Sequence, residues 1–351
     1  MRASPRDSRH AIAGVSVVDT ITICLDAMSG DRGPGVVVDA AATALAAHPN
    51  IDILFVGDEE ELARLAGAAG LDPARYSIRH TDEIVTMEDS ARDAIRRKKN
   101  SSMRVAIDAV KDGVASACVS AGNTGALMAT AKFVLKTIAG IDRPAIISEI
   151  PAYRGRVLFL DLGANPDCSP EQLFQFAVMG SVVARDLTGV RRPRVGLLNI
   201  GVENTKGDNT VREAATLLAD AESINYVGFV EGGDIFNGVA DVVVTDGFTG
   251  NVALKTMEGT AGLIAKNLKE GFSRNLLTRL QALIASPVLK SLQANLDPRH
   301  YNGATFVGLN GIVIKSHGSA DAFAFKHAID TAVLEVETGM SLHIGQQMDR
   351  Q

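Results

Sequence analysis

Small polar residues and glycines fill the stretch DGFTGN, residues 246–251, which comes just after the apolar run VADVVV. Two further stretches have the same character: GVENTKG contains Lys206, and LDLGAN ends at Asn165. Glycine lets a backbone approach a ligand closely, and the free amide groups of such turns bind anions. Lys206 adds a positive charge and Asn251 adds a carboxamide donor. This combination suits a reaction in which the protein positions an anion and stabilises an oxyanion but supplies no nucleophile.

Other chemistries lack the residues that they need. The sequence has no G-x-x-x-x-G-K-S/T phosphate loop, no G-x-G-x-x-G after a strand and no G-x-S-x-G elbow. Cys168 lies near a Gly-Asn loop, but no histidine lies beside it in the sequence where it could act as a base for the thiol. We therefore expect no catalytic thiol. The pairs Asp89/Asp93 and Asp108/Asp112 lie among lysines and arginines. We therefore expect no metal site and no cofactor.

Polar residues of the glycine-rich loops, together with the backbone of one glycine, are candidate ligands for the substrates. They are Asp26, Asn123, Thr124, Asn165, Asp246, Thr249, Gly250 and His317. Of the seven histidines, only His317 lies in a glycine-containing loop after an apolar run. Two interpretations of His317 stay open, a substrate contact or a cap for the helical segment that follows it.

The segments that must hold these loops alternate along the chain. Apolar runs with polar loops after them occupy residues 21–31, 52–58, 117–126, 157–165 and 195–208 and the stretch before residue 246. Helical spacing occupies residues 90–111, 124–135, 170–185, 210–221, 249–268 and 320–337. This alternation predicts an α/β fold with a mostly parallel sheet covered on both faces. Ligands of such sheets bind beyond the carboxyl ends of the strands, so we expect the polar loops to gather at one edge.

Composition limits the class of protein. The 351 residues are 46% hydrophobic and 22% charged, with a net charge of −6, so no nucleic-acid partner is expected. The three cysteines are too scattered for a disulfide framework, which favours a reducing cytoplasm. Residues 1–17 lack the apolar centre of a secretory signal, and we expect them to form a flexible tail. A single domain is expected over residues 18–345, with two lobes as the alternative.

Seven long motifs resemble one family. In chain order they are DAMSGDRGP, AIRRKKNSSMRVAIDAVKDG, CVSAGNTGALM, LDLGANPDC, LLNIGVENTKG, DGFTGNVALKTMEG and YNGATFVGLNGIVIKSHG. These motifs and their spacing, from about Thr20 to about Glu337, closely resemble the PlsX-type phosphate acyltransferases. The resemblance implies a three-layer α/β/α sandwich, similar to the folds of isocitrate and isopropylmalate dehydrogenases and of phosphotransacetylase. It also implies that the protein works as a homodimer.

The implied reaction moves a fatty acyl group from acyl-acyl-carrier-protein to inorganic phosphate, which gives acyl phosphate for bacterial phospholipid synthesis. By motif, Lys206 and Asn251 match residues associated with catalysis in the family. We assign Lys206 to charge stabilisation of the phosphate or the oxyanion, and Asn251 to a hydrogen bond with the carbonyl oxygen. A phosphotransacetylase acting on acyl-coenzyme A, a metal-dependent dehydrogenase of the same fold and a catalytically weak scaffold stay as alternatives. Ser29 stands where the family usually has glycine; if that glycine needs a positive φ, the serine adds strain.

Two surface features bear on partners. We expect Arg92, Arg96, Arg97 and Lys98 to form a docking surface for the acidic carrier protein, with a solvated helix end as the alternative. The segment 271–294 carries an apolar stripe at helical spacing. Such a stripe is typical of a core or a dimer interface, whereas the resemblance favours peripheral contact with the inner face of the membrane. The expected location is the cytoplasm, with attachment to that face left open.

Overall fold

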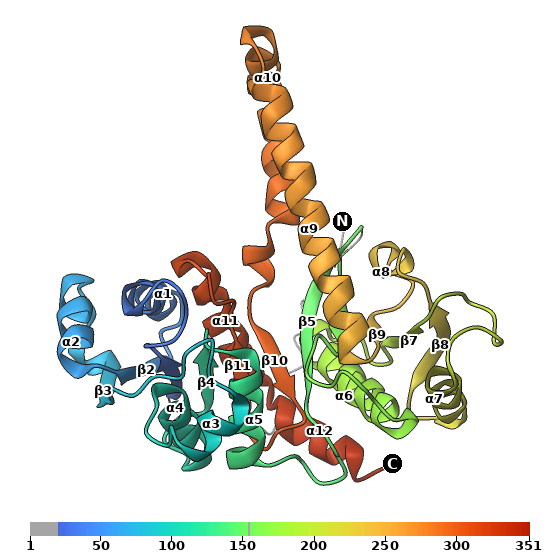
Figure 1. Cartoon of the computed structure of the whole chain (residues 1–351), viewed down its shortest axis with the longest axis horizontal. Coiled ribbons are helices and arrows are strands. Elements are labelled where there is room, and N and C mark those ends of the chain that lie inside the picture. Colours follow the sequence, from blue (N-terminus) through green and yellow to red (C-terminus); the bar gives the residue numbers. More distant parts are fainter. Residues whose placement is uncertain (1–19, 154) are drawn as a thin grey trace, which may run out of the picture.

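A single sheet of eleven strands runs through the molecule in the order β3-β2-β1-β4-β11-β10-β5-β6-β9-β7-β8 (Figure 1). The computed structural model describes residues 20–153 and 155–351, without the side chains of residues 291 and 293–296, so the predicted tail over residues 1–17 lies outside the described residues. The strands are β1 (Ile21–Asp26), β2 (Ile51–Gly57), β3 (Tyr76–His80), β4 (Ala117–Ser120), β5 (Ala145–Ala152), β6 (Gly155–Leu160), β7 (Arg194–Leu198), β8 (Asn225–Val230), β9 (Val242–Val244), β10 (Ala304–Val307) and β11 (Ile312–Lys315).

Most strand pairings are parallel, as the sequence predicts. The exceptions are in the middle, where β10 pairs antiparallel with β11 and β5, and β5 pairs antiparallel with β6. These reversals leave two parallel halves that run in opposite directions: β1 to β4 with β11, and β6 to β9. The carboxyl ends of the two halves therefore lie at opposite edges of the sheet. The expectation that all polar loops gather at one edge is wrong; they form one group on each half.

Helices cover both faces of the sheet, which confirms the three-layer α/β/α sandwich (Figure 1). The helices of the described chain are α1 (Pro34–Ala47), α2 (Glu59–Ala68), α3 (Ala91–Arg96), α4 (Ser102–Lys111), α5 (Thr124–Leu135), α6 (Pro170–Thr188), α7 (Asn209–Asp220), α8 (Asp234–Asn237), α9 (Gly247–Ser273), α10 (Leu276–Leu296), α11 (Ala322–Thr338) and α12 (Met340–Met348), with 3-10 turns at Pro73–Arg75 and Pro298–Tyr301. On the first half, α1, α2 and α11 pack on one face and α4 and α5 on the other. On the second half, α6, α7 and α12 share one face.

Side-chain caps fix where the helices beside the polar loops begin. Asn123 accepts from the first turn of α5, and Asp246 does the same for α9. Such caps satisfy backbone N–H groups that have no partner within the helix. The predicted continuous helix over residues 90–111 is wrong, because Ser101 caps α4 as a separate helix. The basic stretch is therefore divided between α3, a turn and α4.

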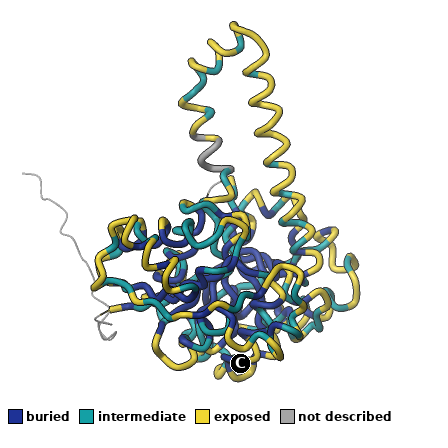
Figure 2. The backbone as a smooth tube through the Cα atoms, turned by 60° about the vertical axis from the view of Figure 1, so that its left-hand side comes forward, coloured by how far each residue is buried: buried dark blue, intermediate teal, exposed yellow. Residues whose placement is uncertain are grey.

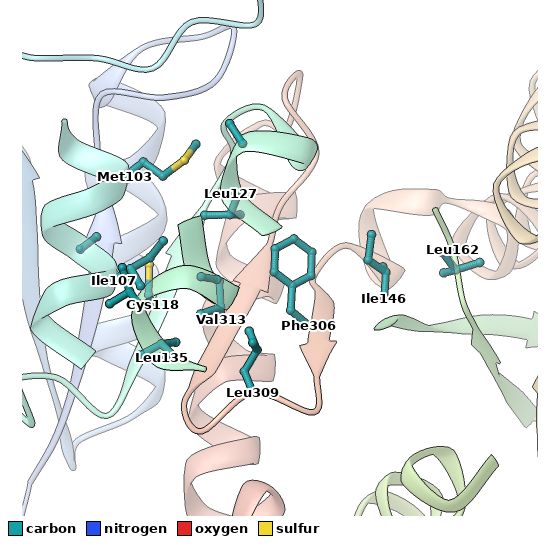
Figure 3. Close-up of a cluster of buried hydrophobic side chains, with 14 of the residues drawn as sticks. Met103, Ile107, Cys118, Leu127, Leu135, Ile146, Leu162, Phe306, Leu309 and Val313 are labelled. Atoms are coloured by element: carbon teal, nitrogen blue, oxygen red, sulfur yellow. The ribbon is translucent and has the colours of Figure 1, made fainter. Parts of the chain in front are cut away.

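One apolar core crosses from the first half of the sheet to the second (Figure 3). Ile107 of α4, Leu127 of α5, Val313 of β11, Phe306 of β10 and Ile146 of β5 all belong to it. Each buried side chain of this kind stabilises the fold by roughly 1.5–3 kcal/mol. The shared core holds α5 firmly at the junction of the two halves, where the candidate site lies.

Helices α9 and α10 project from the body as a long hairpin (Figures 1 and 2). Only Gly247 and Gly250, at its base, are buried among the described residues of α9. The predicted apolar segment 271–294 covers the end of α9 and most of α10, and its stripe is exposed: Leu276, Leu277, Leu280, Leu283, Ile284, Val288 and Leu292. In the part of the chain that the structure describes, no helix has the length and apolar character needed to cross a membrane.

Candidate functional site

The loop after β6 folds around the buried carboxylate of Asp161. Its Oδ1 accepts hydrogen bonds from the N–H groups of Ile146 (2.9 Å), Gly163 (3.2 Å) and Ala164 (3.1 Å). Its Oδ2 accepts from the backbone N–H (2.8 Å) and the side-chain amide (2.9 Å) of Asn165. Burial raises the pKa of Asp161, and these hydrogen bonds counteract part of the rise. The amides of this loop are thus bound to a protein carboxylate and are not free for a substrate anion.

The start of α9 packs directly on this loop, and two glycines allow the close approach. A Cβ at Gly250 would lie 1.9 Å from the carbonyl oxygen of Asp161. A Cβ at Gly247 would lie 2.8 Å from backbone atoms of Asn165, whose carbonyl oxygen accepts from the Gly247 N–H at 2.7 Å. The glycines of DGFTGN therefore serve the packing of α9 against β6, where any side chain would force the two apart.

Asn251 faces the β6 loop from the start of α9. It is partly buried, and its Oδ1 would lie 3.8 Å from a Cβ at Gly163. Its carboxamide has no hydrogen-bond partner among the described residues. By contrast, Asp246 accepts from both the N–H (2.8 Å) and the hydroxyl (2.7 Å) of Thr249. Asn251 thus keeps its polar atoms available, whereas Asp246 and Thr249 bond to each other; substrate binding by Asp246, Thr249 and Gly250 stays a prediction.

Lys206 lies on the loop between β7 and α7. Because β9 pairs with both β6 and β7, the loops after these three strands emerge side by side at one edge. The side-chain amide of Asn199 donates to the Lys206 carbonyl oxygen at 3.2 Å and fixes the loop. The Lys206 side chain is exposed, and its ammonium group has no ion pair in the described part of the chain. Lys206 and Asn251 are therefore held on neighbouring loops with their polar groups uncommitted.

A groove of about 380 Å³ lies between α5 and the second half of the sheet. Its lining includes Thr124, Met128, Ala129 and Lys132 of α5, Arg143 and Ile146 at the start of β5, and Gly163 to Asn165. The groove brings together Thr124 from the first half and Asn165 from the second, two residues that the sequence marks as candidates. Asn251 borders it through Gly163. Lys206 is on the adjacent loop but outside this lining.

A buried polar cluster lies at the carboxyl edge of the first half. Asp26 is completely buried, and its Oδ2 accepts from the hydroxyls of Ser29 and Ser120, both at 2.6 Å. Its Oδ1 has no partner among the described residues. Burial lowers the pKa of nearby Lys315 to about 8, against the opposing effect of Asp31 and Asp26. Asp26 lies outside the lining of the α5 groove, so its role as a substrate ligand stays a prediction.

Asn123 and His317 also have partners within the protein. The Asn123 amide donates to the Met87 carbonyl oxygen at 2.8 Å, so it ties the loop before α3 to the start of α5. The Nδ1 of His317 accepts from the Ser319 N–H at 3.2 Å and lies 2.9 Å from the Ser319 hydroxyl. These contacts fit the interpretation of His317 as a residue that shapes the loop before α11, and its contact with substrate stays a prediction.

The predicted docking residues differ in how free they are. Arg92, Arg96 and Arg97 line a surface cavity of about 580 Å³ beside α3. Lys98, by contrast, donates to the Asp89 carboxylate at 2.5 Å and to a backbone carbonyl at 2.7 Å. The Lys98 hydrogen bond is the main cause that lowers the pKa of Asp89. Arg97 pairs with Asp93, which also lines the cavity, at 3.4 Å, whereas Arg92 and Arg96 have no ion pair among the described residues. Arg92 and Arg96 therefore carry most of the positive charge that a partner would meet, and Lys98 holds the loop before α3 in place.

The sequence did not single out Asp161, Lys132 or Arg143. Asp161 follows an apolar run in the motif LDLGAN. A carboxylate at the end of a buried strand is the feature of the sequence that could have pointed to it. Lys132 lies on a predominantly apolar helix, and Arg143 precedes Pro144 at the start of a strand that alternation with helices does not predict. Only the antiparallel pairing of β5 with β6 brings Arg143 to the loop that holds Asn165.

The chain is similar to known proteins over nearly its whole length. The family model described as fatty acid synthesis protein matches residues 21–343. A phosphate acyltransferase from Alkalilimnicola ehrlichii is 56% identical over 334 residues, which are 95% of this chain and 97% of that protein. Another from Halorhodospira halophila is 55% identical over 332 residues, 94% of this chain and 96% of that protein. The chain belongs to the PlsX-type phosphate acyltransferase family. It is an acyltransferase, as the motifs predict.

Solved structures support the fold expected of this acyltransferase. A phosphotransacetylase from Streptococcus pyogenes matches with a TM-score of 0.59 and 19% identity, covering 91% of this chain and 95% of that one. The EutD phosphotransacetylase from Staphylococcus aureus matches with a TM-score of 0.58 and 18% identity, covering 91% and 94%. At this identity the likeness concerns the fold alone. The expected similarity to the phosphotransacetylase fold is confirmed.

Proposed function

We propose that this acyltransferase moves a fatty acyl group from acyl-acyl-carrier-protein to inorganic phosphate and so supplies acyl phosphate for phospholipid synthesis. The observation that carries the proposal is the pair of uncommitted polar groups at one sheet edge, the Asn251 carboxamide and the Lys206 ammonium. Polar groups held in place without a protein partner are suited to stabilise charge that appears only during a reaction.

Each step of the reaction can be assigned to a group. An oxygen of HPO₄²⁻ attacks the thioester carbonyl carbon and gives a tetrahedral oxyanion. We assign the Asn251 amide N–H as the donor to that oxyanion and Lys206 as the cation that offsets the charge of phosphate. The C–S bond then breaks, and the departing thiolate takes up the proton that phosphate carried. The products are acyl phosphate and the free thiol of the carrier, so atoms and charge balance without a protein nucleophile.

The carrier protein is proposed to dock at α3 through Arg92, Arg96 and Arg97, which line an open cavity. Attraction between exposed charges is screened by salt and mainly changes the rate of encounter. The apparent KM for acyl-acyl-carrier-protein is therefore expected to rise with ionic strength. A KM that does not change with salt would contradict docking at this surface. So would a KM that is the same in an Arg92→Glu, Arg96→Glu variant as in the wild type.

The first experiment follows the reaction itself. Purified protein is mixed with long-chain acyl-acyl-carrier-protein and phosphate, and both free carrier protein and acyl phosphate trapped by hydroxylamine are measured. Release that depends on phosphate supports the proposal. Acyl-coenzyme A is tested in parallel, and release from it alone would move the assignment to a phosphotransacetylase. No release from either donor would refute both.

Two variants test the residue assignments. Lys206→Ala and Asn251→Ala are each expected to lower kcat by about a hundredfold or more, the effect of removing one donor to an oxyanion. Their melting temperatures should stay near that of the wild type, because neither side chain has a hydrogen-bond partner in the described chain. Lys255→Ala, an exposed lysine one turn further along α9, serves as the matched control and should keep full activity. Near-normal rates in both test variants would contradict the assignment.

A further inference from the structure

The α5 groove has a positive lining, with no carboxylate among the described residues that line it. Lys132 of α5 and Arg143, just before β5, face it. Arg143 has no ion pair in the described part of the chain. The Lys132 ammonium donates only to the carbonyl oxygen of Asp142, at 3.3 Å, while the Asp142 carboxylate accepts from Gln175. Two cations with no carboxylate partner thus share one cavity.

The backbone next to them is not free to bind an anion. The N–H groups of Gly163, Ala164 and Asn165, which also line the groove, all donate to Asp161. An anion beside Arg143 and this loop must therefore be held by side chains. The first-turn amides of Thr124 and Gly125, which also line the groove, lie at the opposite end of α5 from Lys132. The planar guanidinium of arginine offers two parallel N–H donors that match two phosphate oxygens, and lysine adds a point charge.

The remaining lining of the groove is mainly apolar. Met128 and Ala129 of α5 and Ile146 of β5 lie along it, beside Lys132 and Arg143. A cavity with an apolar strip next to a positive end fits a substrate pair in which an uncharged chain lies next to a phosphate group. Asn251, the assigned donor to the oxyanion, borders the same cavity through Gly163. The groove is therefore placed where both reactants must meet.

We propose that Arg143 and Lys132 bind the phosphate that accepts the acyl group, with the chain of the thioester donor on the strip formed by Met128, Ala129 and Ile146. The inference rests on the proposed function and adds two residues to it. A phosphate group also occurs in the pantetheine arm of the carrier protein, as a phosphodiester with the same recognition chemistry. Inorganic phosphate is the better fit, because Arg143 precedes Pro144, whose carbonyl oxygen accepts from the Asn165 side-chain amide, so Arg143 lies beside the β6 loop that Asn251 faces.

Steady-state kinetics of the full-length protein distinguish the two sources of phosphate. Arg143→Ala is expected to raise the KM for inorganic phosphate by about tenfold or more, with the KM for the acyl donor within about twofold, because a lost charge-assisted hydrogen bond is worth about a factor of ten. Lys132→Ala should act in the same direction and more weakly, and Arg143→Lys should recover part of the loss. Arg64→Ala on α2, an exposed arginine remote from the groove, is the matched control.

Two synthetic donors complete the comparison. If Arg143 instead binds the phosphodiester, Arg143→Ala will raise the KM for acyl-4′-phosphopantetheine but not for acyl-pantetheine, and the KM for phosphate will not change. That outcome would overturn the assignment to inorganic phosphate. Values for all substrates within about twofold of wild type would overturn a phosphate site in the groove altogether. A circular dichroism melt of each variant separates these outcomes from loss of the fold.

A second measurement needs no catalysis, so it stays informative if the proposed function fails. Phenylglyoxal modifies arginine side chains, and the extent at Arg143 and Arg64 is measured by mass spectrometry of peptides from the intact protein. Inorganic phosphate is expected to slow modification of Arg143 relative to chloride at equal ionic strength, and to leave Arg64 unchanged. Equal slowing at both residues, or none at Arg143, would contradict phosphate binding by Arg143.

Discussion

At the scale of single residues, the structure changes the meaning of several positions that the sequence marks. Asp161 occupies the amides that a substrate anion was expected to use, and this could not be predicted because it depends on how the loop closes. Ser29 is a second case. The only non-glycine residue with positive φ among those described is Lys136, so Ser29 carries no such strain; the adjacent Gly30 has the positive φ, +97°. The Ser29 hydroxyl instead donates to buried Asp26 at 2.6 Å.

Replacement of Ser29 is therefore expected to lower stability even when the new residue is the glycine usual in the family. Ser29→Ala should lower the free energy of unfolding by about 1 kcal/mol, because Asp26 then keeps Ser120 as its only described hydroxyl donor. Ser29→Gly should lower it by about 0.5–1 kcal/mol more, since glycine has more freedom in the unfolded chain. Urea unfolding of the three proteins measures both steps. A Ser29→Gly protein more stable than wild type would mean that the serine is strained.

At the scale of elements, the sequence predicts the helices after the apolar runs but not the direction of the sheet. The antiparallel pairs β5–β6 and β10–β11 join strands that are adjacent in sequence, whereas β10 pairs with β5 and β11 with β4 across long stretches of chain. Periodicity cannot tell a parallel strand from an antiparallel one. These pairings reverse the second half and bring Arg143 to the groove. The loops of β6, β7 and β9 do gather as expected, because those strands are parallel neighbours.

The contact between β10 and α11 gives a pH dependence of stability. Glu335 of α11 is completely buried and accepts from the Thr305 hydroxyl, and burial raises its pKa from 4.5 to about 8. Above about pH 4.5 the unfolded chain loses this proton while the folded protein keeps it up to about pH 8. The contribution to stability is therefore complete below about pH 4.5 and is lost as the pH rises towards 8.

Glu335→Gln keeps the shape and the acceptor oxygen but cannot ionise. The difference in free energy of unfolding, variant minus wild type, should increase steadily between pH 5 and pH 8. This range lies between the pKa of Glu335 in the unfolded chain and its pKa in the folded protein. Urea midpoints at several pH values measure the difference. Thr305→Val should destabilise at every pH, because it removes the donor to a buried carboxyl group. A constant difference between Glu335→Gln and wild type would show that Glu335 is ionised in both states.

At the scale of the whole molecule, the two parallel halves share one sheet and one continuous core, and the α9–α10 hairpin stands outside both. The apolar stripe at residues 271–294 was predictable from spacing, but its partner was not. A stripe of this kind packs on whatever apolar surface is nearest, and only tertiary structure tells whether that surface lies in the same chain. Here the stripe faces outward: residues Leu276, Leu283 and Ile284 are 83%, 73% and 77% exposed.

We expect this exposed stripe to bind a membrane surface, where leucine side chains leave water and the nearby Arg274, Arg279 and Lys290 meet anionic headgroups. In flotation with vesicles that contain anionic lipid, Leu280→Asp should lower the bound fraction by about tenfold or more, since it removes one buried leucine and adds a charge. Leu342→Asp, on the similarly exposed Leu342 of α12, is the control and should float like wild type. Sedimentation without lipid tests the alternative that the stripe forms a dimer interface. If Leu280→Asp halves the mass of the particle and leaves flotation unchanged, the hairpin binds a second copy of the chain and the membrane prediction is wrong.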